Sequence, residues 1–586
     1  MSISNPRQPS VSIDTPMPPP PWALLERELI RAQTQACQEF FDHYFDERGY
    51  LLCVPRWGGD DGPDDAAENL INWTMLHALG APDVVLEMYK KGWEGHLRQY
   101  TEAKTVEVPM ARDGMYYKEF PVMFDWFHHG EWLSAFFLQG LSDPSDVTYG
   151  NRLKRYAGFY MGQDPTAPNY DPEHKIIRSM FNGSRGPLLR KATALDWAGD
   201  PIELAGRFKP GHGERDYQEM LDHFKDYNDV AGDHPMNMGA TTLAFDAYAL
   251  TGESMYRDWL LEYVDAWVDR TEANGGLIPT NIGLDGTIGG ECDGKWYGGV
   301  YGWAFSVIVP QTGEVAHRPS FQDRAYYGFG NALLLTGDQR YVDVWRNMAD
   351  KVNSNAKVID GETMYPRMFG DQGWYDYSPE RFSAGALETY YWSMDRDDLK
   401  RLPKDDWIAF LEGENPEYPV EALQRDFAEL RDKVEAMHLD PTTPDTRMSD
   451  DPNQITPAIV GTLNQLMLGG LPTGRMGSPL HCRVRFFDPE RRRAGIPEDV
   501  AALVDGMTDD EVSLTLVNVN QVEERDVVVQ GGGYGEHQLA SVTVDGTVSP
   551  VDGPHFAMRL APGAGSRMTI KMKRYANQPT LAFPWT

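Results

Sequence analysis

The stretch GATTLAFDAYALTGESMYRDWLLEYVDAWVDR, residues 239–270, contains the pattern that decides the fold. Its first half is apolar nearly all round and stops at a Leu-Thr-Gly-Glu turn, where a left-handed glycine ends one helix and the acidic residue is expected to cap the next. Its second half spaces aromatic and aliphatic residues along one helix face, at Tyr256, Trp259, Leu260, Tyr263, Val264 and Trp267. The stretch therefore predicts a hairpin of an inner and an outer helix.

The same cadence returns elsewhere in the chain. GFGNALLLTGDQ (328–339) is followed by the amphipathic RYVDVWRNMADKV (340–352). DDAAENLINWTMLHALGAPD (64–83) and FLQGLSDPSD (137–146) share the pattern. A diverged repeat of helical hairpins predicts a closed or nearly closed ring, an α/α toroid, over residues 22–440.

Other parts of the chain have a different composition. Residues 1–21 are rich in Ser and Pro and predict a flexible arm, and residues 441–474 read as a linker. From 475 to 586 the pattern alternates with period two, as in EVSLTLVNVNQ (511–521), between Gly-rich turns. The expected fold is mainly α, an α/α toroid followed by a small antiparallel β-sandwich-like domain.

The net charge of −34 and the pI near 4.7 disfavour nucleic acid or an anionic membrane as a partner. No run of 18 apolar residues and no signal-peptide pattern occurs, so a cytoplasmic location is the default expectation; a mature secreted or periplasmic form would look the same. The four cysteines lack CxxC or other zinc spacing, so neither a metal cage nor a disulfide framework is supported, and no cofactor is predicted. A divalent cation held by the acids at 60–65 stays open, and the sequence does not indicate the oligomeric state.

Polar groups precede each expected inner helix. They are Arg56, Asp65 and Glu68 before the first, Asp125, His128 and His129 before the second, and Tyr227, Asp233 and His234 before the one at 239. In a ring of hairpins all inner helices start on the same face, so we expect these groups to converge on one site.

Each of these groups also has a plainer interpretation. The acids at 64–68 suit a helix cap and first turn, where the helix dipole favours them. A histidine near a core helix can simply be hydrogen-bonded. Adjacent His128 and His129 point about 100° apart on a helix, so they are not the pair that would ligate one metal ion.

Two further segments carry candidate binding residues. GGECDGKWYGGVYGWAFSV (289–307) sets Trp296 and Tyr297 among glycines, as in sites that stack sugar rings; aromatic packing at a helix start explains it equally well. The basic segment 173–191 contains Asn182 and Arg185 around a tight turn, which suits a carboxylate ligand or a solvated basic face.

The hairpin ring followed by a β domain resembles the α/α-toroid carbohydrate-active enzymes, which include polysaccharide lyases and six-hairpin glycosidases. HHGEWLSAFFLQGLSD (128–143) is similar to the Asn-His-Gly start of an inner helix in alginate and heparin lyases. His129 and Gly130 match that motif, and His128 stands in place of the asparagine. No single family is assigned.

This resemblance implies an enzyme that cleaves a uronate-containing oligosaccharide or polysaccharide by β-elimination. His129 would be the base or the carboxylate neutraliser, and Tyr301 the base and acid, with Tyr227 and Tyr326 as substitutes. Asn182, Arg185 and His234 would bind the carboxylate. Trp296 and Tyr297 would stack a sugar ring, and His128 and Arg56 would complete the substrate contacts.

Three alternatives remain open. An inverting glycoside hydrolase of the same architecture would pair Asp65 or Glu68 with Asp125 or Asp233. A non-catalytic glycan-binding protein would need only the aromatic platform. Chemistry on another substrate class is also compatible, because a fold does not fix a function.

Overall fold

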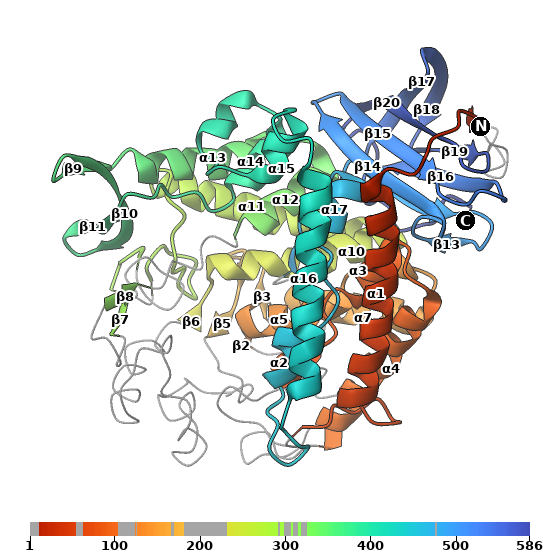
Figure 1. Cartoon of the computed structure of the whole chain (residues 1–586). Coiled ribbons are helices and arrows are strands. Elements are labelled where there is room, and N and C mark those ends of the chain that lie inside the picture. The colour runs from red at the N-terminus through yellow and green to blue at the C-terminus, as the bar shows by residue number, and fades with distance from the viewer. Residues whose placement is uncertain are drawn as a thin grey trace.

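The computed structural model describes residues 11–53, 63–102, 123–124, 126–163, 165, 169–180, 231–290, 293–297, 306–308, 315–317, 325–474 and 477–585. Figure 1 shows that most of the described elements before about residue 470 are helices and that the C-terminal part forms a β-rich region. The fold class expected from the sequence is confirmed: helical hairpins come first and a mainly antiparallel β region follows.

The helices in the described ranges have the following bounds: α1 (Pro21–Tyr44), α2 (Pro63–Glu68), α3 (Trp73–Leu79), α4 (Asp83–Glu102), α5 (Trp126–Phe136), α6 (Gln139–Ser142), α7 (Val147–Tyr160), α10 (Thr241–Thr251), α11 (Ser254–Ala273), α12 (Tyr326–Thr336), α13 (Arg340–Asn353), α14 (Ala386–Ser393), α15 (Asp406–Leu411), α16 (Tyr418–Leu439) and α17 (Gly461–Leu468). Short 3-10 helices are η2 (Pro235–Ala240), η4 (Arg396–Lys400) and η5 (Asp451–Ile455). Among the described residues, no helix combines the length and apolar character needed to cross a membrane.

The two best-patterned hairpins are α10–α11 and α12–α13. Every residue of α10 from 241 to 249 and of α12 from 328 to 335 is buried, whereas α11 and α13 are buried on one face. Gly252 and Gly337 end the inner helices with φ of 71° and 68°, in the left-handed region expected for them. One expected detail is absent: the Glu253 side chain makes no capping hydrogen bond to α11.

Contacts between successive hairpins bring the helical region back on itself. Inner helix α10 packs against α7, α11 and α12, and α3 packs against α4 and α6. The first long helix, α1, packs along α16, nearly 400 residues later in the chain, as Figure 1 shows. The helical region is therefore closed by its first and one of its last helices.

The strands in the described ranges are β1 (Val11–Ile13), β2 (Met123–Phe124), β3 (Tyr170–Asp171), β4 (Ile176–Ile177), β5 (Ser179–Met180), β6 (Ala231–Gly232), β7 (Ser306–Ile308), β8 (Val315–His317), β9 (Lys357–Ile359), β10 (Glu362–Gly370), β11 (Gly373–Ser378), β12 (Val484–Asp488), β13 (Arg493–Ala494), β14 (Val500–Met507), β15 (Glu511–Asn518), β16 (Arg525–Gly531), β17 (Gln538–Val544), β18 (Thr547–Gly553), β19 (His555–Leu560) and β20 (Gly565–Lys573). The C-terminal region consists of two five-stranded sheets, ordered β1-β19-β16-β12-β13 and β14-β15-β20-β17-β18. Strand β14 packs on α1 and α17, so one apolar core continues from the helices into the sheets.

Two segments differ from the expected organisation. Part of the N-terminal arm is ordered, because β1 pairs in parallel with β19, from Val11 opposite Met558 to Ile13 opposite Leu560. Residues 441–474, expected to be a linker, include η5 and α17, and the leucines of α17 are buried against β14 and α16. Short apolar runs such as GTLNQLML have too little periodicity to identify that helix.

Candidate functional site

A three-stranded sheet gathers the segments that lead into the site. Its order is β2-β5-β6; β2 pairs in parallel with β5, Phe124 opposite Met180, and β5 pairs antiparallel with β6, Ser179 opposite Gly232. Strand β2 precedes α5 and β6 precedes η2 and α10. The sheet therefore joins the starts of two helices that are more than 100 residues apart in the chain.

Asp233 lies at the centre of a buried hydrogen-bond network beside this sheet. Its Oδ1 accepts from the His234 backbone N–H at 2.8 Å, from Asn237 Nδ2 at 2.9 Å and from the Tyr263 hydroxyl at 3.0 Å. Its Oδ2 accepts from the Ile177 backbone N–H at 3.0 Å. Four donors thus fix this carboxylate, which is 0% exposed.

Burial is the dominant influence on the Asp233 carboxyl and raises its pKa to about 6. The charge of Arg270 and the hydrogen bonds from Asn237, Ile177 and Tyr263 act in the opposite direction. Both oxygens are occupied and neither reaches solvent. Asp233 therefore holds the surrounding groups in place and is not presented to a ligand.

Asn237 connects this network to α5. Its amide nitrogen donates to Asp233 and, at 2.8 Å, to Ser179 Oγ, while its oxygen accepts from the Trp126 backbone N–H at 3.1 Å. Trp126 is the first residue of α5, so the Asn237 side chain hydrogen-bonds to the start of α5, to strand β5 and to the turn before α10. Asn237 lies in the polar segment expected before the inner helix at 239, but nothing in the sequence indicated that it would bond to Trp126.

The start of α5 carries the His-Gly motif. His128 and His129 lie in its first turn, and their side chains are outside the described part of the structure. Gly130 faces the indole of Trp126: a Cβ at Gly130 would lie 2.7 Å from Nε1 of that ring. Trp126 is buried and packs edge-on against Tyr160, with the ring centroids 5.6 Å apart. The glycine is therefore required by packing in addition to any role in binding.

Helix α2 brings its acids to the same region, because it packs against α5. Glu68 is 7% exposed, and its Oε2 accepts from Asn453 Nδ2 at 2.9 Å, which ties α2 to η5. Asp65 is half-buried. Since η2 also packs against α5, both α2 and η2 contact the helix that carries the His-Gly motif. We call the first turn of α5, the turn that leads into η2 and the adjacent helix α2 the helix-start site.

His234 is buried directly before η2, at 2% exposure. Its Nδ1 lies 3.3 Å from the Thr280 carbonyl oxygen, which can only accept, so Nδ1 carries the proton in this contact. The backbone N–H of Thr280 donates to the Trp296 carbonyl at 2.7 Å. His234 is thereby linked through residue 280 to the expected aromatic platform.

That platform is larger than the sequence indicated. Trp296 packs against Phe369 with centroids 4.8 Å apart, and Phe369 packs edge-on against Trp374 at 4.9 Å. Tyr297 lies 5.0 Å from Phe369 and donates its hydroxyl to Asp371 at 2.6 Å. Phe369 and Trp374 are cross-strand partners in the β10–β11 hairpin, whose high aromatic content was the available signal.

Six predicted site residues lie outside the described residues: Arg56, Asp125, Asn182, Arg185, Tyr227 and Tyr301. Tyr326, the other substitute base, begins α12 and packs against Trp345 and Trp392. Within the described ranges, no three His, Cys, Asp or Glu side chains gather closely enough to hold a metal ion.

Comparison with curated proteins gave no significant match. Among solved structures, the chain is similar to a glycoside hydrolase family 76 mannosidase, Bt3792, from Bacteroides thetaiotaomicron VPI-5482, with 10% identity, a TM-score of 0.30, and coverage of 75% of this chain and 99% of that one. It is also similar to cellobiose 2-epimerase from Bacillus thermoamylovorans B4167, with 12% identity, a TM-score of 0.22, and coverage of 61% and 95%. At these TM-scores neither likeness carries an argument for this chain. The model of the family described as a domain of unknown function, DUF8034, matches residues 10–364, and the chain belongs to that family.

Proposed function

We propose that this chain is a carbohydrate-active enzyme that cleaves a uronate-containing oligosaccharide or polysaccharide by β-elimination at the helix-start site. One observation carries the proposal: Asn237 bonds the first residue of α5 to the Asp233–His234 turn, with 3.1 Å between Asn237 Oδ1 and the Trp126 nitrogen. This bond supports the proposal, because it links the first residue of α5, the helix that carries His128 and His129, to the segment that carries His234.

Elimination requires three functions of such a site. A cationic or hydrogen-bonding group neutralises the uronate carboxylate, which acidifies the proton on C5. A base removes that proton, the electron pair forms the C4=C5 double bond, and the C4–O bond breaks; the leaving oxygen then takes a proton from an acid. We assign His129 as base or neutraliser and Tyr301 as base and acid. Asn182, Arg185 and His234 would hold the carboxylate.

The contacts of the acids favour this chemistry over hydrolysis. An inverting hydrolase needs two accessible carboxyl groups about 6.5–9.5 Å apart. Asp233 has both oxygens occupied and is fully buried, and Glu68 is buried and bonded to Asn453. Asp65 remains as the half-buried acid on α2, with Asp125 as its candidate partner. Because α2 packs on α5, Asp65 lies on a helix that contacts the one carrying the His-Gly motif, and an inverting hydrolase remains the second candidate.

The decisive experiment is product analysis on a panel of uronate-containing polysaccharides. Elimination releases chains that end in an unsaturated uronate, which absorbs in the ultraviolet, together with new reducing ends. We expect both signals to rise together. New reducing ends without the unsaturated product would instead establish the hydrolase. Binding of a polysaccharide with neither product would indicate a glycan-binding protein.

The His129→Gln variant tests the assignment of residues. Loss of an acid–base group should lower kcat about 10²- to 10⁴-fold while the circular dichroism spectrum stays unchanged. His438→Gln is the matched control, because His438 lies in the last turn of α16 with 59% of its side chain exposed and pairs with Glu39. Equal activity of the two variants would contradict a chemical role for His129.

A further inference from the structure

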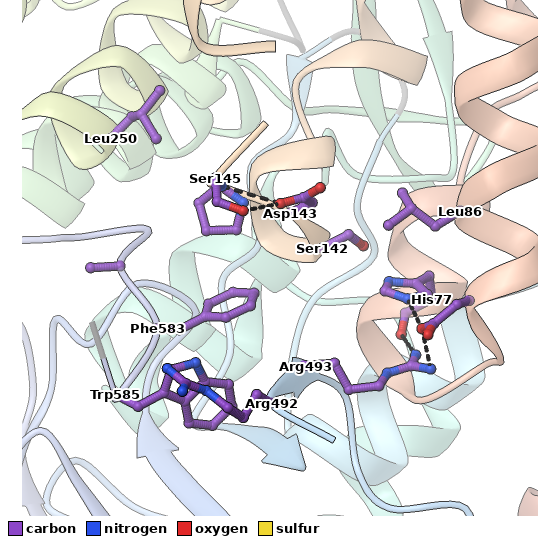
Figure 2. Close-up of a pocket in the computed structure, with 13 residues that line it drawn as sticks. His77, Leu86, Ser142, Asp143, Ser145, Leu250, Arg492, Arg493, Phe583 and Trp585 are labelled. Atoms are coloured by element: carbon purple, nitrogen blue, oxygen red, sulfur yellow. Dashed lines mark hydrogen bonds and ion pairs between the residues drawn. The ribbon is translucent and has the colours of Figure 1, made fainter. Parts of the chain in front are cut away.

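A cavity lies where the helical region meets the β region. Its volume is about 580 Å³, and its walls come from the α3–α4 turn, the α6–α7 loop, the β12–β13 turn and the C-terminal segment around Phe583 and Trp585. We call it the junction pocket; Figure 2 shows its lining residues. This volume lies within the range of about 300–1,000 Å³ that is typical of small-molecule sites.

The acids of the junction pocket already have cationic or hydrogen-bonding partners. Asp83 Oδ1 lies 2.6 Å from Arg493 Nη1 and 3.1 Å from His77 Nε2. Burial lowers the pKa of His77, so Arg493 supplies the positive charge. Asp143 accepts from Lys90 Nζ at 2.7 Å. These carboxylates are neutralised, yet the Asp83 side chain is 66% exposed and can still accept from ligand hydroxyls.

The two neighbouring arginines of the pocket differ in their contacts. The Arg493 guanidinium donates to the backbone carbonyls of His77 and Ala81, which fixes it against the α3–α4 turn. Arg492 is exposed, has φ of 54°, and makes no ion pair or side-chain hydrogen bond with any residue in the described ranges. Its guanidinium is therefore the charged group of the pocket wall that is available to an external anion.

An aromatic wall completes the pocket. Phe583 and Trp585 are half-buried and pack edge-on against each other, with centroids 5.6 Å apart. Both also pack against the fully buried Phe487, at 5.2 and 5.8 Å, which holds the two rings in place. In Figure 2, Phe583, Trp585 and Arg492 lie on the side opposite His77 and Leu86. An aromatic ring and an unpaired guanidinium in the walls of one pocket suit a ligand that has an apolar ring face and an anionic group.

We propose that the junction pocket binds an acidic sugar. Arg492 pairs with the carboxylate of the sugar, Trp585 stacks against the face of its ring, and Asp83 and Ser145 hydrogen-bond its hydroxyls. The choice of a uronate rests on the proposed function, whereas the site itself stands on the pocket residues alone. Such a site would retain one end of a substrate chain, or a released product, at a distance from the site of cleavage.

Calorimetric titration tests this proposal. Glucuronate, galacturonate and mannuronate are compared with glucose, galactose and mannose, and we expect at least one uronate to bind at least about tenfold more tightly than its neutral counterpart, the effect of about 1.4 kcal/mol from one charge-assisted contact. Arg492→Gln should remove this preference, and Trp585→Leu should weaken binding of the uronate. Arg491→Gln is the matched control, because the neighbouring Arg491 is 58% exposed, pairs with Glu498 at 3.6 Å and does not line the pocket.

Several outcomes would overturn the acidic-sugar site. One is that no uronate binds more tightly than its neutral counterpart. Another is that Arg491→Gln and Arg492→Gln lose the same amount of uronate affinity. A third is that acetate binds as tightly as the uronates. The result is separable from the helix-start proposal. Arg492-dependent binding without any cleavage product would support the pocket and contradict the lyase. Cleavage by elimination without uronate binding at the pocket would support the lyase and contradict the pocket.

Discussion

The Tyr263 hydroxyl donates a hydrogen bond to Oδ1 of Asp233 at 3.0 Å, and so joins the outer helix α11 to the turn from which the inner helix α10 starts. Both side chains are fully buried. The amphipathic face of α11 therefore does more than cover α10, because one of its aromatic residues also orients the carboxylate that organises the helix-start site.

The first prediction concerns the pH dependence of stability. Burial raises the pKa of Asp233 from 3.8 to about 6, so the native state keeps this proton after the unfolded chain has lost it. The associated stability is fully present below pH 3.8 and is lost as the pH rises to about 6, by on the order of 3 kcal/mol. When Asp233→Asn is unfolded in urea between pH 4 and 7, its free energy of unfolding should not show this pH-dependent loss.

Tyr263→Phe provides the companion measurement. It removes one donor that favours the ionised carboxylate, so the pKa of Asp233 should rise further and the loss of stability should extend above pH 6. If Asp233→Asn keeps the pH slope of the wild type, the carboxyl is not the titrating group.

The second prediction uses Asn237→Asp. The new carboxylate would face Asp233 Oδ1 in place of an amide donor at 2.9 Å. Two carboxylates this close share a proton at low pH and repel when both ionise. The free energy of unfolding should therefore fall, relative to wild type, by about 1–3 kcal/mol more at pH 8 than at pH 5. Asn237→Ala removes a donor that favours the ionised carboxylate but adds no charge, so its extra loss at pH 8 relative to pH 5 should be smaller than that of Asn237→Asp.

The sequence predicted what depends on local pattern. The period of Tyr256, Trp259 and Tyr263 identified the outer helix, and the Leu-Thr-Gly turns located the ends of α10 and α12. Asp233 and His234 were expected at the site because they precede an inner helix. The contact between Asn237 and Trp126 was not predictable, because it spans 111 positions and has no periodic signature.

The aromatic platform shows the same limit. Trp296 was recognised because glycines flank it, whereas Phe369 and Trp374 lie in a separate hairpin and meet it only in the folded chain. Helix α17 lies in the segment predicted to be a linker. It was not predicted because its eight residues have too little periodicity to indicate a helix. In both cases the structure depends on contacts between segments that are far apart in the chain, and the local sequence pattern does not reveal such contacts.

The third prediction compares the two glycines that end the inner helices. Gly252 has φ of 71° and open space where a Cβ would be added, so Gly252→Ala should cost only the left-handed strain, about 1–2 kcal/mol. At Gly337 the added Cβ would also lie 3.1 Å from Tyr575 Cβ and 3.2 Å from its carbonyl oxygen. Gly337→Ala should therefore lower the free energy of unfolding further, as measured in urea. An equal cost at both sites would contradict a tight contact between residue 337 and the C-terminal segment.

The last prediction concerns the glycine of the His-Gly motif. In Gly130→Ala the new methyl group would meet the Trp126 indole at 2.7 Å, and that ring cannot retreat because Tyr160 and Gly477 pack against it. Overpacking costs about 1–3 kcal/mol, against a gain in helix propensity of about 1 kcal/mol. Relief of this clash should distort the first turn of α5, which carries His129, and so should also lower kcat. Gly158→Ala in α7 is the control, because its nearest contact is an ordinary 3.4 Å, so its stability should stay level or rise. If both variants keep full turnover and stability, Gly130 does not set the position of the first turn of α5.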